Sequence, residues 1–139
     1  MVAMREDLTG WLEAKAIRKN DSTTIAAFIF DWISRYGVPG MVVNDGGAEN
    51  KKVAAHLMKR YRIYNVRIAT YHPQSNGLIE RGHQSIVDAL AKLGGQWHLL
   101  LSFVVWADRI TTRRSTGFPP YQLLFGQECV LPVELSAIS

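Results

Sequence analysis

Two acidic residues in this sequence stand where a protein could present carboxylates to a metal ion, and the first of them is Asp45. It directly follows the apolar run Met41–Val43 and precedes two glycines. At the carboxyl end of a strand in an open α/β sheet, Asp45 would lie where such sheets bind ligands, and the glycines would let a bulky substrate approach closely. An Asp before two glycines is also typical of an ordinary turn, so this position alone leaves both interpretations open.

The second acidic residue is Glu80, about thirty-five residues further along and one or two turns into a helix expected over 75–93. A Glu near the start of a helix often does no more than favour the helix dipole. Carboxylates are nevertheless the ligands that Mg²⁺ prefers, and two such ions can stabilise the attacking and leaving oxygens when a phosphodiester bond is transferred. The four His residues and the single Cys129 show no zinc-finger spacing.

The segment between these two acidic residues is strongly basic. Residues 51–67 hold six Lys and Arg and no Asp or Glu, whereas the whole chain has a formal charge of only +4. A basic face of this kind suits a phosphate backbone, although a solvated helix face is the common alternative. Its place between the two carboxylates favours nucleic acid, and we expect DNA contacts from Lys51, Lys52, Lys59 and Arg60.

The length and composition are those of one soluble globular domain spanning residues 1–139. Hydrophobic residues make up 47% of the chain and charged residues 20%, as in ordinary soluble proteins. No apolar run is long enough to span a membrane, and the first residues lack the pattern of a signal peptide. A single cysteine excludes an internal disulfide, and a reducing compartment is expected.

The hydrophobic pattern predicts a mixed α/β order of elements. We expect a hairpin of strands Val2–Arg5 and Leu12–Ile17, followed by a helix that Asp21 caps and that ends before Gly37. A buried strand of a parallel sheet is expected at Met41–Val43, then a helix over about 50–61 and a strand over 64–69. Three helices complete the order: one over about 75–93, one over 97–109 and a short one that ends at Gly126. The 97–109 helix is apolar on nearly every side, so it is either fully buried or shared with a second subunit. We expect a homodimer contact through Trp97–Arg109.

Several motifs in order resemble those of one known family. They are Leu8-Thr9-Gly10-Trp11, Tyr71-His72-Pro73-Gln74, Gly77-Leu78-Ile79-Glu80-Arg81, Ser115-Thr116-Gly117-Phe118-Pro119-Pro120-Tyr121 and Leu123-Leu124-Phe125-Gly126. Together they cover nearly the whole chain. The sequence resembles the catalytic core of retroviral-type integrases, and most closely that of gypsy-type LTR retrotransposons.

This resemblance implies an RNase H-like fold, a mixed sheet flanked by helices. It implies metal-dependent DNA 3′-processing and strand transfer with Mg²⁺ (or Mn²⁺), and it implies DNA, both element ends and target, as the partner. It also implies action in the nucleus after a cytoplasmic particle stage, with no membrane involved.

The resemblance also assigns roles to individual residues. Asp45 and Glu80 match the second and third metal ligands. Tyr71 and Gln74 match loop positions that contact the DNA end, and Arg81 and His83 lie on the helix face that meets the substrate backbone.

Matched on Thr9-Gly10-Trp11, the first metal ligand of the family would lie upstream of Met1 on the central strand of the sheet, so the resemblance implies that this chain lacks that strand. Asp7, Glu6 and Glu13 are rejected as substitutes, because Asp7 lies in the hairpin turn and Glu13 in the following strand. We therefore expect little or no catalysis from this chain alone. The alternative function is an inactive integrase remnant that binds nucleic acid or associates with other subunits. An RNase H acting on RNA–DNA hybrids shares the fold but is disfavoured by the Tyr71–Gln74 loop.

Overall fold

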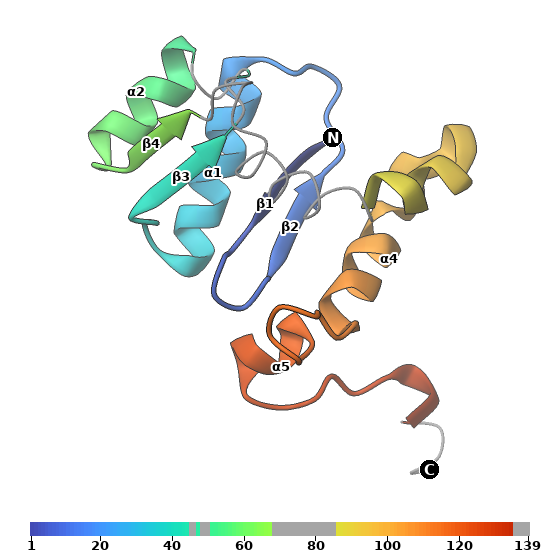
Figure 1. The fold of residues 1–139 in the computed structure, drawn as a ribbon. Helices are drawn as coiled ribbons and strands as arrows, with labels where there is room; N and C mark the ends of the chain where they lie inside the picture. Colours follow the sequence, from blue (N-terminus) through green and yellow to red (C-terminus); the bar gives the residue numbers. More distant parts are fainter. Residues whose placement is uncertain (45–46, 48–50, 68–85, 135–139) are drawn as a thin grey trace. The chain divides into compact units, whose positions relative to one another are not determined.

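The structure, a computed structural model, describes residues 1–44, 47, 51–67 and 86–134 (Figure 1). The contacts between residues divide the chain into two compact units. The first unit holds residues 1–2 and 15–84, and the second holds 3–14 and 85–139. The single-domain interpretation stays a prediction.

The first helix of the first unit is α1 (Ser22–Tyr36), and both of its ends agree with the sequence prediction. Asp21 caps it, because its carboxylate accepts a hydrogen bond of 2.8 Å from the amide of Thr24. This hydrogen bond lowers the pKa of Asp21 below its usual value. The apolar residues Ile25, Phe28, Ile29 and Trp32 of α1 are buried. Tyr36 is 41% exposed, with its ring centroid 5.0 Å from that of Trp32.

After α1 the chain forms a parallel strand–helix–strand unit of β3 (Met41–Asn44), α2 (Lys52–Arg60) and β4 (Tyr64–Arg67). The two strands pair in parallel, with Met41 opposite Tyr64 and Asn44 opposite Arg67. The helix buries Ala54 and Met58, packs against α1 and also contacts β4. A parallel pair needs such a crossover connection.

The prediction that Met41–Val43 is a buried strand is correct for the strand and wrong for the burial. Met41 is 55% exposed and Val43 44% exposed, whereas Asn44 is buried. Successive side chains of a strand point to opposite faces, so Met41 and Val43 share one face of β3 and Asn44 lies on the other. Among the described residues, β3 pairs with β4 alone, and the face that carries Met41 and Val43 is exposed, which a continuous apolar run cannot reveal.

The second unit contains most of the predicted hairpin, formed by β1 (Val2–Arg5) and β2 (Leu12–Lys15) (Figure 1). It also contains the helical residues 86–92, the short 3-10 helix η2 (Gly94–Gln96), α4 (Trp97–Ile110) and α5 (Pro120–Phe125). Pro120 stands in the first turn of α5, and Gly126 ends this helix in the left-handed conformation. The core of this unit is formed by Trp11, Leu12, Ile86, Leu90, Leu101, Val105 and Pro120.

The expected sheet is present as two small sheets, β1–β2 and β3–β4. The combination of helices with these strands is the mixed α/β class that the element order predicts. The strand predicted over 64–69 is described only to Arg67, and the helix predicted over 75–93 only from residue 86.

Candidate nucleic-acid interface

The predicted metal ligands and DNA-end contacts lie outside the residues that the structure describes. This applies to Asp45, Glu80, Tyr71, Gln74, Arg81 and His83. Their roles therefore stay predictions.

The described residues next to Asp45 define the edge of the sheet from which it follows. Because β3 and β4 are parallel and Asn44 is opposite Arg67, both strands reach their carboxyl ends at the same edge. In the sequence, Asp45 directly follows β3, and the predicted loop with Tyr71 comes four residues after β4. Ligands of open α/β sheets bind outside the carboxyl ends of the strands, so the topology agrees with the predicted place of the site.

A hydrogen-bonded pair of side-chain amides joins the two strands at this edge, and little in the sequence indicates it. The side-chain amide of Asn44 donates a hydrogen bond to the side-chain oxygen of Asn65 on β4. Asn44 is only 8% exposed, and a buried amide requires such partners. The only signal in the sequence is a polar residue that ends an apolar run one position before a candidate ligand.

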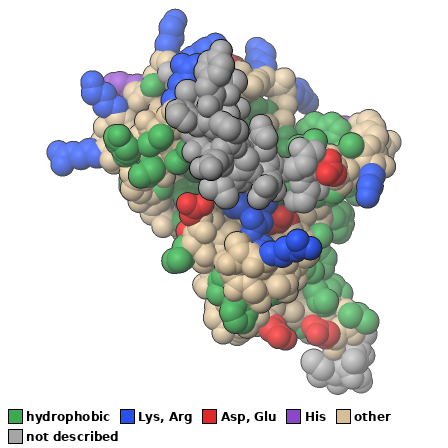
Figure 2. Space-filling model, in the orientation of Figure 1, with side chains coloured by type: hydrophobic (Ala, Val, Ile, Leu, Met, Phe, Trp, Pro, Cys, Tyr) green, Lys and Arg blue, Asp and Glu red, His purple; other side chains and the backbone are tan. Residues whose placement is uncertain are grey.

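The four described DNA-contact candidates lie at the two ends of α2. Lys51 and Lys52 stand at its start, Lys59 and Arg60 stand in its last turn, and all four are exposed. His56 is exposed between them, one turn from Lys52 and from Arg60. Figure 2 shows Lys and Arg side chains gathered around a His over the part of the molecule that contains α2. We call Lys52, His56, Lys59 and Arg60 the basic face of α2.

The basic face is held in place by α1. Lys51, the residue before α2, makes no side-chain cap. Instead the Ser22 hydroxyl donates a hydrogen bond of 2.6 Å to the Lys51 carbonyl and accepts one of 2.9 Å from the Ala54 amide. Ser22 therefore satisfies one of the free amides at the start of α2.

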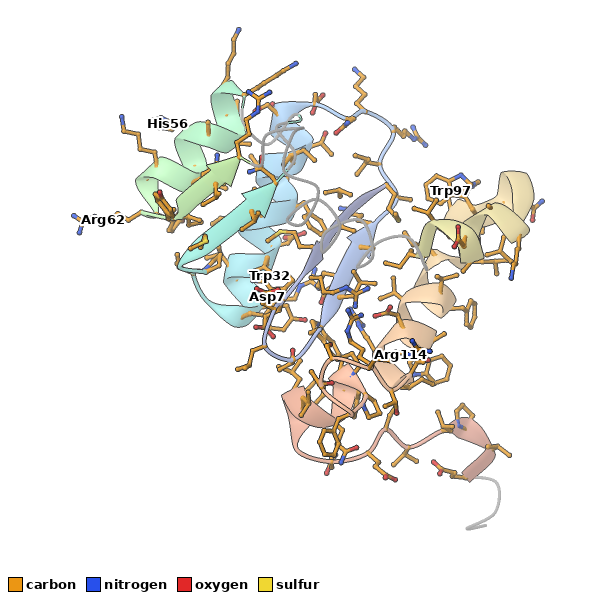
Figure 3. The ribbon with its side chains drawn as sticks, viewed as in Figure 1. Asp7, Trp32, His56, Arg62, Trp97 and Arg114 are labelled. Carbon is orange, nitrogen blue, oxygen red and sulfur yellow. The ribbon has the colours of Figure 1, made fainter. Side chains whose placement is uncertain are left out.

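The carboxylates of the hairpin are engaged in structural contacts or stand in the turn. Glu6 accepts hydrogen bonds from the Leu8 amide at 2.6 Å and the Thr9 amide at 2.7 Å, and one from the Thr9 hydroxyl at 2.5 Å. Burial raises the pKa of Glu6, but these hydrogen bonds outweigh it and leave the pKa below its usual value of 4.5. Glu13 forms an ion pair of 3.2 Å with Arg109, and Asp7 is exposed in the turn (Figure 3). Glu6 and Glu13 thus have structural partners, and the rejection of all three residues as ligands stays a prediction.

The apolar helix α4 is only half covered within its own unit. Leu101 and Val105 are buried, but Leu99 is 63% exposed and Phe103 is 61% exposed. A groove of about 420 Å³ runs between residues 86–93 and α4, and it is lined by Ile86, Ala89, Leu93, Leu100, Phe103, Val104, Ala107, Asp108 and Thr111. Full burial of this helix, one of the two predicted alternatives, does not occur in the structure.

In the part of the chain that the structure describes, no group of three or more His, Cys, Asp or Glu side chains converges as metal ligands would. No helix there has both the length and the apolar character needed to cross a bilayer.

Known proteins similar to this chain include polyproteins of retroviruses and of a transposon. A scan against models of protein families finds no match. The Gag-Pol polyprotein of avian reticuloendotheliosis virus is 31% identical over 132 residues, which cover 91% of this chain and 11% of the polyprotein. The retrovirus-related Pol polyprotein from transposon 412 of Drosophila melanogaster is 29% identical, with the same coverage. The chain thus spans about a tenth of the length of these relatives.

Two solved structures similar to this chain are integrase catalytic core domains. The catalytic core domain of BIV integrase matches 97% of this chain and 87% of its own, with a TM-score of 0.69 and 24% identity. The HTLV-2 integrase catalytic core domain, solved in complex with magnesium, matches 86% of this chain and 80% of its own, with a TM-score of 0.68 and 17% identity. The chain resembles retroviral-type integrase catalytic cores in its fold. Its fold is the RNase H-like fold that the motifs imply.

The similarities do not separate retroviral from retrotransposon relatives. The viral and the transposon polyproteins have nearly equal identities, 31% and 29%. The closer likeness to gypsy-type elements therefore stays a prediction.

Proposed function

We propose that this chain is the core of a DNA integrase and takes part in joining element DNA ends to target DNA. The observation that carries the proposal is the likeness to an integrase catalytic core over 97% of the chain. The shared edge at which β3 and β4 end supports it, because this edge precedes both Asp45 and the Tyr71 loop. The reaction would take place in the nucleus, after a cytoplasmic particle stage.

A divalent cation fits the donor set of this proposal. Asp45 and Glu80 are carboxylates, and neither motif contains a Cys, as expected for Mg²⁺ or Mn²⁺ rather than zinc. When bound, the cation would neutralise charge on the oxygens of the phosphodiester that is attacked. The magnesium of the HTLV-2 core is consistent with this choice.

The DNA backbone would be held by the protein's own cations. Lys51, Lys52, Lys59 and Arg60 are exposed and can pair with phosphates without reading bases. Tyr71, Gln74, Arg81 and His83 are proposed to contact the DNA end, on the basis of the motifs alone.

A second copy of the chain is the proposed occupant of the open face of α4. Phe103 and Leu99 present apolar surface beside a groove of about 420 Å³. A side chain such as Phe103 can enter the groove of the other copy, and the reverse contact follows from two-fold symmetry.

The proposal is tested by measuring 3′-processing, strand transfer and DNA binding of this chain with Mn²⁺ or Mg²⁺. Asp45→Asn serves as the control for chemistry, and the Lys59→Ala/Arg60→Ala double variant serves as the control for DNA binding. DNA binding that the double variant weakens about tenfold or more supports the DNA-backbone role of α2. Turnover that Asp45→Asn abolishes supports the metal-dependent chemistry.

Two outcomes distinguish the alternatives. DNA binding without turnover would favour the inactive remnant, an alternative that the engagement of Glu6 and Glu13 supports, since neither is free to serve as a third ligand. Absence of DNA binding under low salt would contradict both functions.

A further inference from the structure

The turn that follows α2 contains the one unusual backbone conformation of the described residues. Arg62 has φ 58°, and it is the only residue other than glycine with a positive φ in that part of the chain. In this conformation the Cβ of an L-amino acid crowds the backbone, so glycine is the usual occupant. Elsewhere the chain follows this rule, as Gly37 after α1 and Gly126 after α5 illustrate.

The conformation of Arg62 is required by the way α2 ends. The Ile63 amide donates to the Met58 carbonyl at 2.8 Å, and the Arg62 amide donates to the Lys59 carbonyl at 3.1 Å. This pair of hydrogen bonds is the Schellman motif, which needs a left-handed residue at the position of Arg62. Ile63 is buried, and Tyr64 then starts β4 with a hydrogen bond of 3.0 Å to the Gly40 carbonyl. The turn therefore cannot relax without moving β4.

The side chain of Arg62 does not compensate for this conformation within the described structure. It is exposed, and no hydrogen bond or ion pair joins its guanidinium to any described residue. Figure 3 shows the side chain extending outwards beyond the end of α2. A residue that is held in an unfavourable conformation and gives nothing to the fold is a candidate for function.

The positive charge of Arg62 and its place beside other basic residues favour phosphate binding as that function. Arg62 directly extends the basic face of α2, whose Lys59 and Arg60 stand in the last helical turn. In a helical residue at this point, the helix would set the direction of the side chain. In the left-handed turn, the side chain of Arg62 points away from the end of α2 instead. Arginine is suited to a phosphate because its planar guanidinium can bind two oxygens at once.

We propose that Arg62 binds a backbone phosphate of DNA and lengthens the DNA-binding surface beyond the end of α2. This inference rests on the DNA-binding role proposed above and adds a residue that the family motifs do not assign. The contact is to phosphate and is independent of base sequence. If the proposal is correct, replacing Arg62 by glycine raises the stability of the folded protein and lowers its affinity for DNA.

The experiment compares Arg62→Gly with the unmodified chain, using thermal unfolding and the fluorescence anisotropy of a labelled DNA duplex of about 20 base pairs. Removing the unfavourable conformation is expected to raise the Tm by about 3 °C. Losing one phosphate contact is expected to weaken binding about threefold to tenfold and to reduce the slope of log K against log salt by about one.

Two variants make the comparison specific. Arg114→Gly removes the same charge from an exposed turn of the other unit (Figure 3), where φ is not positive, so it should neither raise the Tm nor weaken binding. Arg62→Lys keeps both the charge and the backbone cost, and it should retain most of the binding with no gain in Tm.

Failure of this inference can be told apart from failure of the proposed function. If Lys59→Ala/Arg60→Ala loses DNA binding while Arg62→Gly binds like the unmodified chain with the same salt slope, only the role of Arg62 is overturned. A lower Tm for Arg62→Gly would also overturn it, because Arg62 would then serve the fold. A chain that does not bind DNA at all would overturn both.

Discussion

At the scale of single residues, a carboxylate organises the turn of the β1–β2 hairpin. The side chain of Glu6 accepts three hydrogen bonds from Leu8 and Thr9, and its main-chain carbonyl accepts one of 2.9 Å from the Gly10 amide. Gly10 has φ 77°, and a Cβ there would come within 2.6 Å of the Arg113 side chain. The Thr9-Gly10-Trp11 motif thus has a structural explanation, separate from any chemistry.

The hydrogen bonds of Glu6 make stability depend on pH in a defined direction. In the folded protein they lower the pKa of the Glu6 carboxyl below 4.5. The stabilisation of the fold by these hydrogen bonds is therefore present above pH 4.5 and is lost as the pH falls through the pKa of Glu6 in the folded protein. We expect Glu6→Gln to reduce the free energy of unfolding by about 1 kcal/mol at pH 7, with the difference shrinking below about pH 4.5. Thermal unfolding across pH 3–7 measures it.

The matched control for this prediction is Asp7→Asn, which removes the neighbouring charge from the same turn. The structure gives the Asp7 side chain no hydrogen bond to any described residue. A loss of stability that is as large in Asp7→Asn as in Glu6→Gln would mean that charge in the turn matters and that the hydrogen bonds do not.

Sequence reasoning worked best at this scale where the cause is local. The Asp21 cap could be predicted because its hydrogen bond joins residues only three positions apart. The left-handed Arg62 could not, because the conformation follows from where β4 must begin, and arginine itself carries no signal of it. The amide pair Asn44–Asn65 depends on strand register, which a single sequence does not show.

At the scale of elements, two arginines attach α4 to the hairpin. Arg5 on β1 forms a two-bond ion pair with Asp108 on α4, at 2.8 and 3.0 Å, and both side chains are nearly buried. Arg109 lies over the Trp11 ring at 4.1 Å and donates to the Leu12 carbonyl at 3.0 and 2.8 Å. A bidentate pair of this kind fixes orientation as well as distance.

Removing one partner of this pair should be costly. We expect Asp108→Asn to lower the free energy of unfolding by about 2–4 kcal/mol, because the Arg5 charge would remain in a site with little access to water. Chemical denaturation of the two proteins measures the change. The double variant Arg5→Met/Asp108→Leu should recover part of the loss, and a double variant that is less stable still would contradict the explanation.

The order of the elements was predictable because hydrophobic periodicity is a local signal. The bounds of α1 and β1 agree with the prediction, and those of α2 and α4 differ by one or two residues. The exposure of Met41 and Val43 was not predictable, because a continuous apolar run does not show which face of a strand another element covers. The metal site was predicted from motifs, and its two carboxylates lie outside the described residues.

At the scale of the whole molecule, the two units differ in charge. The first unit has eleven Lys and Arg against five Asp and Glu, and the second has five against seven. The phosphate binding proposed above would therefore belong with the first unit, and the association proposed for the exposed apolar face of α4 would belong with the second. Exposed aromatic side chains of this kind mark surfaces for association.

The association proposed for α4 predicts a change of oligomeric state. We expect Phe103→Glu to raise the dimer dissociation constant about 30-fold, which corresponds to about 2 kcal/mol. Analytical ultracentrifugation over a range of protein concentrations measures it. Ser102→Glu is the control, because this exposed neighbour is not among the residues of the groove. Equal weakening by both variants, or a wild-type chain that is monomeric at all concentrations, would count against an interface at this face.

The cap that Ser22 supplies to α2 couples the opening of two helices that are separate in sequence. Its hydroxyl belongs to the first turn of α1, yet it accepts from the Ala54 amide in α2. Any fluctuation that unwinds this turn of α1 therefore also frees an amide of α2, so the two helix starts behave as one cooperative unit. Hydrogen exchange of the Ala54 amide would thus report on α1, and a Ser22→Ala variant would let α2 fray without any change in its own sequence.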